Sequence, residues 1–104
     1  MIYAAKILAS GQLPLAKATL FTAQADSVIK SVFLVNTNVA NAGVNIYLKK
    51  LGSTERRIIP MNMVLGTRFQ WETIPEFSME AEDTIEGDST VISVDYSIVG
   101  GIVP

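Results

Sequence analysis

The chain has 104 residues, enough for one domain and too few for a second hydrophobic core. Eight basic against ten acidic residues give a net charge of −2, 49% of the residues are hydrophobic, and only 17% are charged. This balance excludes an intrinsically disordered chain, which needs low hydrophobicity and high charge. It also argues against nucleic-acid binding, which needs clustered basic residues. The 29 Val, Ile and Thr residues favour β-sheet.

The sequence contains neither Cys nor His. Disulfides, zinc sites built on these residues, and Ser–His or Cys–His nucleophile pairs are therefore excluded within this chain. We expect a protein that is not an enzyme and that holds no metal and no cofactor. The longest apolar-dominated run, residues 28–35, is far shorter than the roughly 20 residues of a membrane span. Residues 1–6 lack a signal-peptide pattern, so we expect a chain made in a cytoplasm and without a membrane partner.

Short apolar segments alternate with turn signals along the chain, which is the rhythm of an all-β protein. The first two strands are predicted at residues 4–10 and 16–22, followed by a polar turn at 24–27. A helix over residues 16–25 is the competing interpretation, but its Thr and Phe residues favour a strand and no capping pattern supports it.

The strongest predicted strand covers residues 28–37. Apolar side chains are expected on both of its sides: Val28, Val32 and Leu34 on one, and Ile29, Phe33 and Val35 on the other. Such a strand is expected at the centre of the fold and covered on both faces.

The second half of the chain contains further predicted strands, at residues 44–49, 56–59, 68–79 with an interruption at Pro75, and 92–98. In the first of these, the even-numbered residues are apolar and the odd-numbered ones mostly polar, which predicts one buried and one wet face. Turns are predicted at residues 52–54 and 86–88, and Gly100-Gly101 is expected to end the last strand.

These segments predict an all-β fold in which residues 1–104 form a single antiparallel β-sandwich domain. We expect eight or nine short strands, at most one helical turn, and a jelly-roll or immunoglobulin-like arrangement. Connections this short cannot carry the crossovers that parallel strands require.

Acidic residues are concentrated in the segment 72–88, which holds seven of the ten. Three interpretations are open. Asp83, Glu86 and Asp88 could contribute oxygens to a calcium site, although their spacing does not match an EF-hand. Glu80 and Glu82, predicted on one side of an extended segment, could form a hydrolytic carboxylate pair. A solvated edge that repels non-specific strand pairing is the interpretation we favour.

The basic counterpart consists of Lys49, Lys50, Arg56 and Arg57, on either side of the predicted turn at 52–54. It is either a solvated face or a patch that meets an acidic partner, such as the 72–88 segment of a neighbouring copy.

The termini are unusually apolar, and two aromatic residues alternate with polar ones in the stretch 68–73. We interpret these residues as candidates for an interface with another subunit: Met1, Ile2, Tyr3, Phe69, Trp71, Ile102 and Val103. A carbohydrate- or receptor-binding module that uses Trp71, Tyr47 or Tyr96 as a stacking platform is the alternative.

Three segments together carry a resemblance: residues 18–23 (ATLFTA), 28–37 (VIKSVFLVNT) and 44–48 (VNIYL). Their order resembles a small β-sandwich of tailed-bacteriophage virion proteins, which also have a Gly-Asp-Thr-Ile turn. That turn corresponds here to residues 82–87, with Glu82 in the place of the glycine. The resemblance extends over residues 15–99 and consists of strand and turn patterns rather than catalytic residues.

The resemblance implies a non-catalytic virion structural protein, most simply a capsid decoration or cement protein, or else a tail, neck or baseplate component. It further implies a homo-oligomer, with a trimer preferred, and contact with the major capsid protein or another virion protein.

Overall fold

The computed structural model of the chain describes residues 5–67, 70–74 and 76–103, with the backbone alone for residues 70–73. Ten strands and no helix lie in these described residues. The strands are β1 (Lys6–Gln12), β2 (Ala18–Thr22), β3 (Ser27–Asn36), β4 (Ala42–Lys49), β5 (Arg56–Arg57), β6 (Met63–Leu65), β7 (Gln70–Ile74), β8 (Phe77–Met79), β9 (Thr84–Ser89) and β10 (Val94–Ile102). A search of the described residues for a helix long and apolar enough to cross a membrane finds none.

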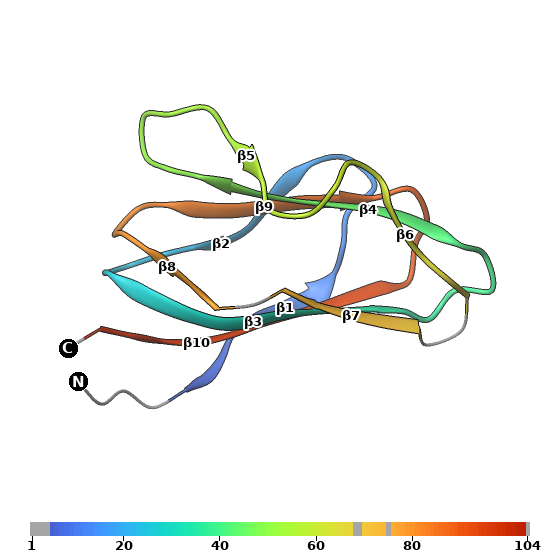
Figure 1. Cartoon of the computed structure of the whole chain (residues 1–104), viewed down its shortest axis with the longest axis horizontal. Helices are drawn as coiled ribbons and strands as arrows, with labels where there is room; N and C mark the ends of the chain where they lie inside the picture. The colour runs from blue at the N-terminus through green and yellow to red at the C-terminus, as the bar shows by residue number, and fades with distance from the viewer. Residues whose placement is uncertain (1–4, 68–69, 75, 104) are drawn as a thin grey trace.

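The strands form two antiparallel sheets packed face to face (Figure 1). In the first sheet the order is β1-β10-β3-β7, and β8 pairs with another stretch of β3. In the second sheet the order is β2-β9-β4-β5, and β6 pairs with another stretch of β4. The all-β, antiparallel sandwich expected from the sequence is confirmed.

The strand order distinguishes between the two arrangements that the sequence left open. β7 and β8 extend along β3 one after the other, and β5 and β6 do the same along β4, so the ten segments occupy eight strand positions. Strands that follow one another in these positions alternate between the two sheets, except that β4 and the position held by β5 and β6 are neighbours in the second sheet, and this is the order of a jelly roll. An immunoglobulin fold instead keeps several hairpin neighbours in one sheet.

The central position predicted for the 28–37 strand is confirmed, but the prediction that both of its faces are covered is wrong. β3 lies between β10 on one side and β7 and β8 on the other. Ser31 pairs with Val99 and Ile29 with Gly100, so Lys30 is the extra residue of a β-bulge. The bulge reverses the alternation, and Ile29 therefore faces the core together with Val32. Phe33, on the other face, remains 40% exposed.

The turn predicted at residues 86–88 and the strand end predicted at Gly100-Gly101 are also wrong, because these glycines lie inside strands. Gly87 belongs to β9, where an added Cβ would lie 2.9 Å from Leu20 Cδ1. Gly100 belongs to β10, where an added Cβ would lie 2.2 Å from the Val28 carbonyl oxygen. These positions require glycine because neighbouring strands approach closely, and not because the chain turns.

The predicted wet face of residues 44–49 is wrong as well. Val44 and Ile46 face the core as expected, but Asn45 and Tyr47, on the opposite face of β4, are also buried. Side chains from β5 and from the connections around it cover them, as described below. The last strand begins later than the predicted residue 92, because β10 begins at Val94 and Ile92 is exposed.

Candidate interaction surfaces

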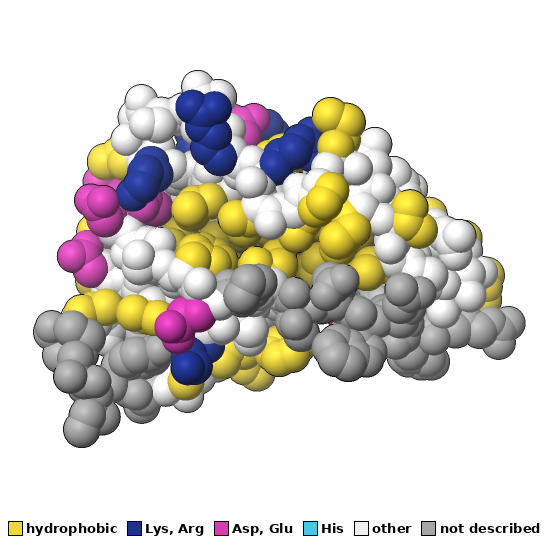
Figure 2. Space-filling model, viewed as in Figure 1, with side chains coloured by type: hydrophobic (Ala, Val, Ile, Leu, Met, Phe, Trp, Pro, Cys, Tyr) yellow, Lys and Arg dark blue, Asp and Glu magenta, His cyan; other side chains and the backbone are white. Residues whose placement is uncertain are grey.

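The two ends of the sandwich differ in charge. We call one of them the charged end; it consists of the connections at residues 23–26, 50–55 and 80–83. We call the other the uncharged end; it consists of residues 13–16, 37–41 and 90–93 together with β6. Figure 2 shows acidic side chains gathered at the end near the C-terminus, whereas white and yellow side chains dominate toward the opposite end.

A buried carboxylate ties the connections of the charged end together. Asp83 Oδ1 accepts a hydrogen bond from the Leu51 amide (3.1 Å), and Oδ2 accepts one from the Glu80 amide (3.0 Å). Lys50 Nζ lies 3.4 Å from Oδ2. Burial opposes ionisation of Asp83, but the two amide hydrogen bonds and the positive charge of Lys50 outweigh it, so the pKa of Asp83 lies below its ordinary value.

The acidic segment therefore contains carboxylates with different surroundings. Asp83 is occupied by donors within the chain, and Asp88 accepts a hydrogen bond from Asn45 Nδ2 (2.8 Å). Within the described residues, no three acidic side chains converge in a way that could hold a metal ion. The side chain of Glu72 lies outside the described part of the chain, and Glu76 Oε2 lies 3.2 Å from Lys30 Nζ.

The extended segment predicted around Glu80 and Glu82 is wrong. The Asp83 amide donates to the Glu80 carbonyl (3.1 Å), so the chain turns at this point. Glu82 has a φ of 72°, in the region that favours glycine. The two carboxylates line different surface hollows, and Glu80 Oε1 lies 3.1 Å from Lys50 Nζ.

The four basic residues predicted as a patch have separate roles. Lys50 binds Glu80 and Asp83, and the hydrogen bond to Glu80 together with the charge of Asp83 raises the pKa of Lys50. Arg57 Nη1 donates to the Asn45 side-chain oxygen (2.6 Å). Arg56 is exposed and Lys49 is half-buried. Two of the four cations are thus engaged by neighbours in the same chain.

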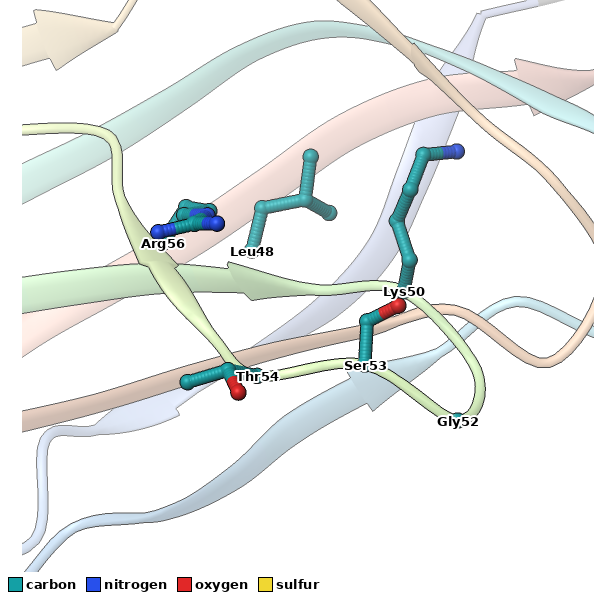
Figure 3. Close-up of a pocket in the computed structure, with 6 residues that line it drawn as sticks. All are labelled: Leu48, Lys50, Gly52, Ser53, Thr54 and Arg56. Carbon is teal, nitrogen blue, oxygen red and sulfur yellow. The ribbon is translucent and has the colours of Figure 1, made fainter.

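An open hollow of about 810 Å³ lies beside the β4–β5 hairpin. Its lining consists of Leu48, Lys50, Gly52, Ser53, Thr54 and Arg56 (Figure 3). Figure 3 shows the side chains of Leu48 and Lys50 extending on the same side of the hairpin. The predicted turn is confirmed here, with Gly52 at a φ of 75°. The two cations and two hydroxyls of this lining could bind an acidic group. The Lys50 ammonium, however, is already paired with two carboxylates.

Neither tyrosine offers a free platform for a sugar ring. Tyr47 is buried, and two cations already lie against its ring: Lys17 Nζ is 5.0 Å and the Arg57 guanidinium carbon 4.9 Å from the ring centroid. Tyr96 is half-buried and packs against the core. The side chain of Trp71 lies outside the described part of the chain.

The predicted terminal interface can be followed only in part. Met1, Ile2, Tyr3 and Phe69 lie outside the described residues. Ile102 is exposed, and the Val103 amide donates to the Asp26 carbonyl (2.9 Å). Ile102 lines a hollow of about 260 Å³ together with Ile7 and Phe21, so the structure brings the end of β10 next to the start of β1.

The uncharged end was not predicted as a surface. One large apolar side chain projects from each of its parts, Leu15 (61% exposed), Val39 (71%), Val64 (62%) and Ile92 (62%). A signal was present in the sequence, because residues 13–16, 36–48, 58–67 and 89–94 contain no charged residue. What the sequence did not show is that these segments meet at one place.

Hydrogen bonds hold the parts of the uncharged end together through the β9–β10 connection. The Ser89 amide donates to the Pro14 carbonyl (2.9 Å), and Asn38 Nδ2 donates to the Ile92 carbonyl (3.0 Å). The Gly43 amide donates to Thr90 Oγ1 (2.8 Å), and Gly43 pairs with Val64. The four apolar side chains are therefore carried by segments that contact one another.

Comparison with known proteins adds little to this description. No protein-family model matches the chain, and no curated protein matches it in sequence. A solved structure described as that of infectious bursal disease virus, Gx strain, is similar with a TM-score of 0.47 and 17% sequence identity. The match covers 97% of this chain and 32% of the viral one, so the chain spans about a third of that protein. A similarity at this level says nothing about what the chain does.

Proposed function

We propose that the chain is a non-catalytic structural subunit of a tailed-bacteriophage virion, made in the host cytoplasm, and that it decorates the capsid as a cement protein. The strand and turn pattern of residues 15–99 supports this proposal. So does the jelly-roll strand order, an architecture that is common among viral capsid domains. A tail, neck or baseplate component is the alternative location.

The observation that carries the proposal is the outer face of the first sheet. Phe33 and Ile7 are exposed on it, and Val28, Val35 and Val99 are only half-buried. Ile7 pairs with Val99 across β1 and β10, whereas Phe33 and Val35 pair with Ser97 and Asp95, so apolar residues alternate with polar ones on this face. A sheet face that meets water is normally polar, and large apolar side chains exposed on it, such as Phe33 and Ile7, mark a contact with another molecule. A neighbouring virion protein would cover this face.

The proposed mechanism is mechanical. Apolar surface buried between subunits contributes about 25 cal/mol per Å², from which the costs of association are subtracted. Repeated over many copies, such contacts would hold a shell together without any chemical step. In this proposal the chain acts as a homo-oligomer, with a trimer preferred because closed symmetric assemblies suit three-fold positions of a shell.

The proposal is tested on purified particles of the virus that encodes the chain. We expect the chain in the particles at a fixed copy number, measured by quantitative mass spectrometry, and gold-labelled antibodies on the capsid in electron micrographs. Phe33→Lys should lower the copy number, whereas Leu51→Lys, an equal change of charge at another exposed apolar residue, should not. Absence of the chain from purified particles would refute the virion role, and labelling of the tail alone would select the alternative location.

A further inference from the structure

We infer that the uncharged end is a self-association surface, which packs against the same end of another copy of this chain. The inference assigns a surface to the homo-oligomer of the proposed function, and it does not depend on a place in a virion. It rests on Leu15, Val39, Val64 and Ile92, the four apolar side chains carried by connected segments.

Charge favours a second copy as the occupant. The described residues of the uncharged end carry no ionisable side chain, and Lys17, which follows residues 13–16, is paired with Glu55 of the charged end, so two uncharged ends can meet without removing a charge from water. The charged end differs, because Asp26, Glu55, Glu80, Glu82 and Asp83 outnumber Lys50 there. Two charged ends would repel each other. Contact through the uncharged ends places the acidic ends of the copies farthest apart, which suits a chain of net charge −2.

The exposed apolar area is of the size that a weak but specific contact requires. Burying a Val, Leu or Ile side chain removes roughly 60–120 Å² from water, so four side chains in each of two copies supply on the order of 700 Å². This apolar area is below the roughly 1,000 Å² of a stable interface, so the contact also requires polar area from the Asn, Thr and Ser residues between the four side chains. We therefore expect association that depends on concentration.

The asparagines in these connections keep the surface uncharged while satisfying the backbone. Asn36 is fully buried; its Nδ2 donates to the carbonyls of Ala40 (2.9 Å) and Gly66 (2.7 Å), and its Oδ1 accepts from the Asn38 amide (2.9 Å). Asn38 Oδ1 accepts from the Ala40 amide (2.9 Å). The polar groups of these two asparagines are thus paired with the backbone of the same chain, which lowers the cost of removing water from them.

The test is the mass of the isolated chain by sedimentation velocity over about a hundredfold range of concentration. We expect the wild type to shift from monomer to a multiple of the chain mass. Ile92→Lys and Val39→Lys should each remain monomeric, whereas Leu51→Lys, which changes an equally exposed residue at the charged end, should associate like the wild type. Melting curves establish that each variant is folded.

Further measurements distinguish this contact from two other possible contacts between copies. Raising the salt concentration about tenfold should not dissociate the oligomer, because the contact contains no ion pairs and the acidic repulsion is screened. Dissociation by salt would overturn the inference in favour of a contact between the basic residues and the acidic segment. Loss of association in Phe33→Lys alone would overturn it in favour of the outer sheet face. A monomeric wild type at every concentration would refute it and would count against a homo-oligomer in solution, whereas the presence of the chain in virions is decided separately by its copy number in purified particles.

Discussion

The two ends of the sandwich are closed in the same manner but with opposite chemistry. Each contains one buried polar side chain that joins several connections: Asp83 at the charged end and Asn36 at the uncharged end. Asp83 accepts backbone amides, whereas Asn36 mainly donates to backbone carbonyls. A carboxylate suits the first set of partners and an amide the second, because an ionised carboxylate can only accept hydrogen bonds.

The difference has consequences for how each end behaves. The connections held by Asp83 depend on its ionisation and are surrounded by further acidic residues. The connections held by Asn36 have no titrating group among the partners of its side chain. The uncharged end is therefore able to meet an apolar surface without removing a charge from water, which the charged end cannot do at low cost.

The largest expected effect is that of removing Asn36. Asn36→Leu leaves the carbonyls of Ala40, Leu65 and Gly66 and the Asn38 amide without their partner. At about 1 kcal/mol for each of the four lost hydrogen bonds, we expect the free energy of unfolding to fall by about 4 kcal/mol, measured by urea denaturation.

The matched control for this variant is Asn38→Ala, which changes an asparagine whose two side-chain hydrogen bonds are exposed. We expect a loss of about 1 kcal/mol or less for it. Equal losses for Asn36→Leu and Asn38→Ala would show that burial of Asn36 does not determine the stability of this end.

At the charged end, Asp83→Asn replaces one accepting oxygen by an amide that meets donors. Hydrogen bonds to charged groups contribute about 1.5–3 kcal/mol, so we expect a loss of about 2 kcal/mol at neutral pH. The pKa of Asp83 is lowered by folding, so its contribution is present above the unfolded value of about 3.9 and disappears as the pH falls through the folded value.

The stability losses of the Asp83 and Asn36 variants should depend differently on pH. The difference in stability between the wild type and Asp83→Asn should shrink as the pH falls below about 4, whereas that for Asn36→Leu should stay constant. Both are followed by denaturation at a series of pH values, with the exposed Asp95→Asn as the control for a lost charge. If the stability difference between the wild type and Asp83→Asn persisted at acid pH, the ionised carboxylate of Asp83 would not be what stabilises the charged end.

A smaller effect is expected at Glu82, a residue with a backbone conformation that favours glycine. Its φ of 72° is unfavourable for any residue with a Cβ. Glu82→Gly should raise the free energy of unfolding by about 1 kcal/mol. Ala81→Gly, at a neighbouring position without a positive φ, should lower it by about 0.5–1 kcal/mol. The opposite order of the two variants would contradict the backbone argument.

The smallest effect is expected at Thr84, where β9 begins near the charged end. Its hydroxyl oxygen is buried without a hydrogen-bond partner. Thr84→Val keeps the shape of the side chain and removes the unpaired polar atom, so we expect a gain of up to about 1 kcal/mol. A melting temperature below that of the wild type would show that the hydroxyl is satisfied after all.

The strands were predictable where alternation is regular and unpredictable where it depends on a distant neighbour. Val94 and Ile98 follow the period of two and are buried as expected. Gly87 and Gly100 resemble turn residues in the sequence, because nothing local reveals that Leu20 and Val28 approach them. The bulge at Lys30 likewise follows from pairing with β10, and it reverses the side on which Ile29 lies.

The candidate surfaces were predictable to a smaller extent. The basic residues were recognised by their spacing, but Arg57 turns toward Asn45, a contact with a residue on the neighbouring strand. The uncharged end was overlooked because it is assembled from separate segments of the chain, each of which looks like an ordinary loop.

The sequence by itself determined the secondary structure class, the absence of Cys and His chemistry, and the grouping of acidic residues in one segment. These properties are local or compositional, and composition and a period of two are sufficient to read them. Only the tertiary structure decided between a jelly roll and an immunoglobulin-like sandwich, exposed one face of β3, and brought four uncharged segments to one end. Those features depend on which strands pair across long distances in the chain, and pairing is decided by the packing of the whole core.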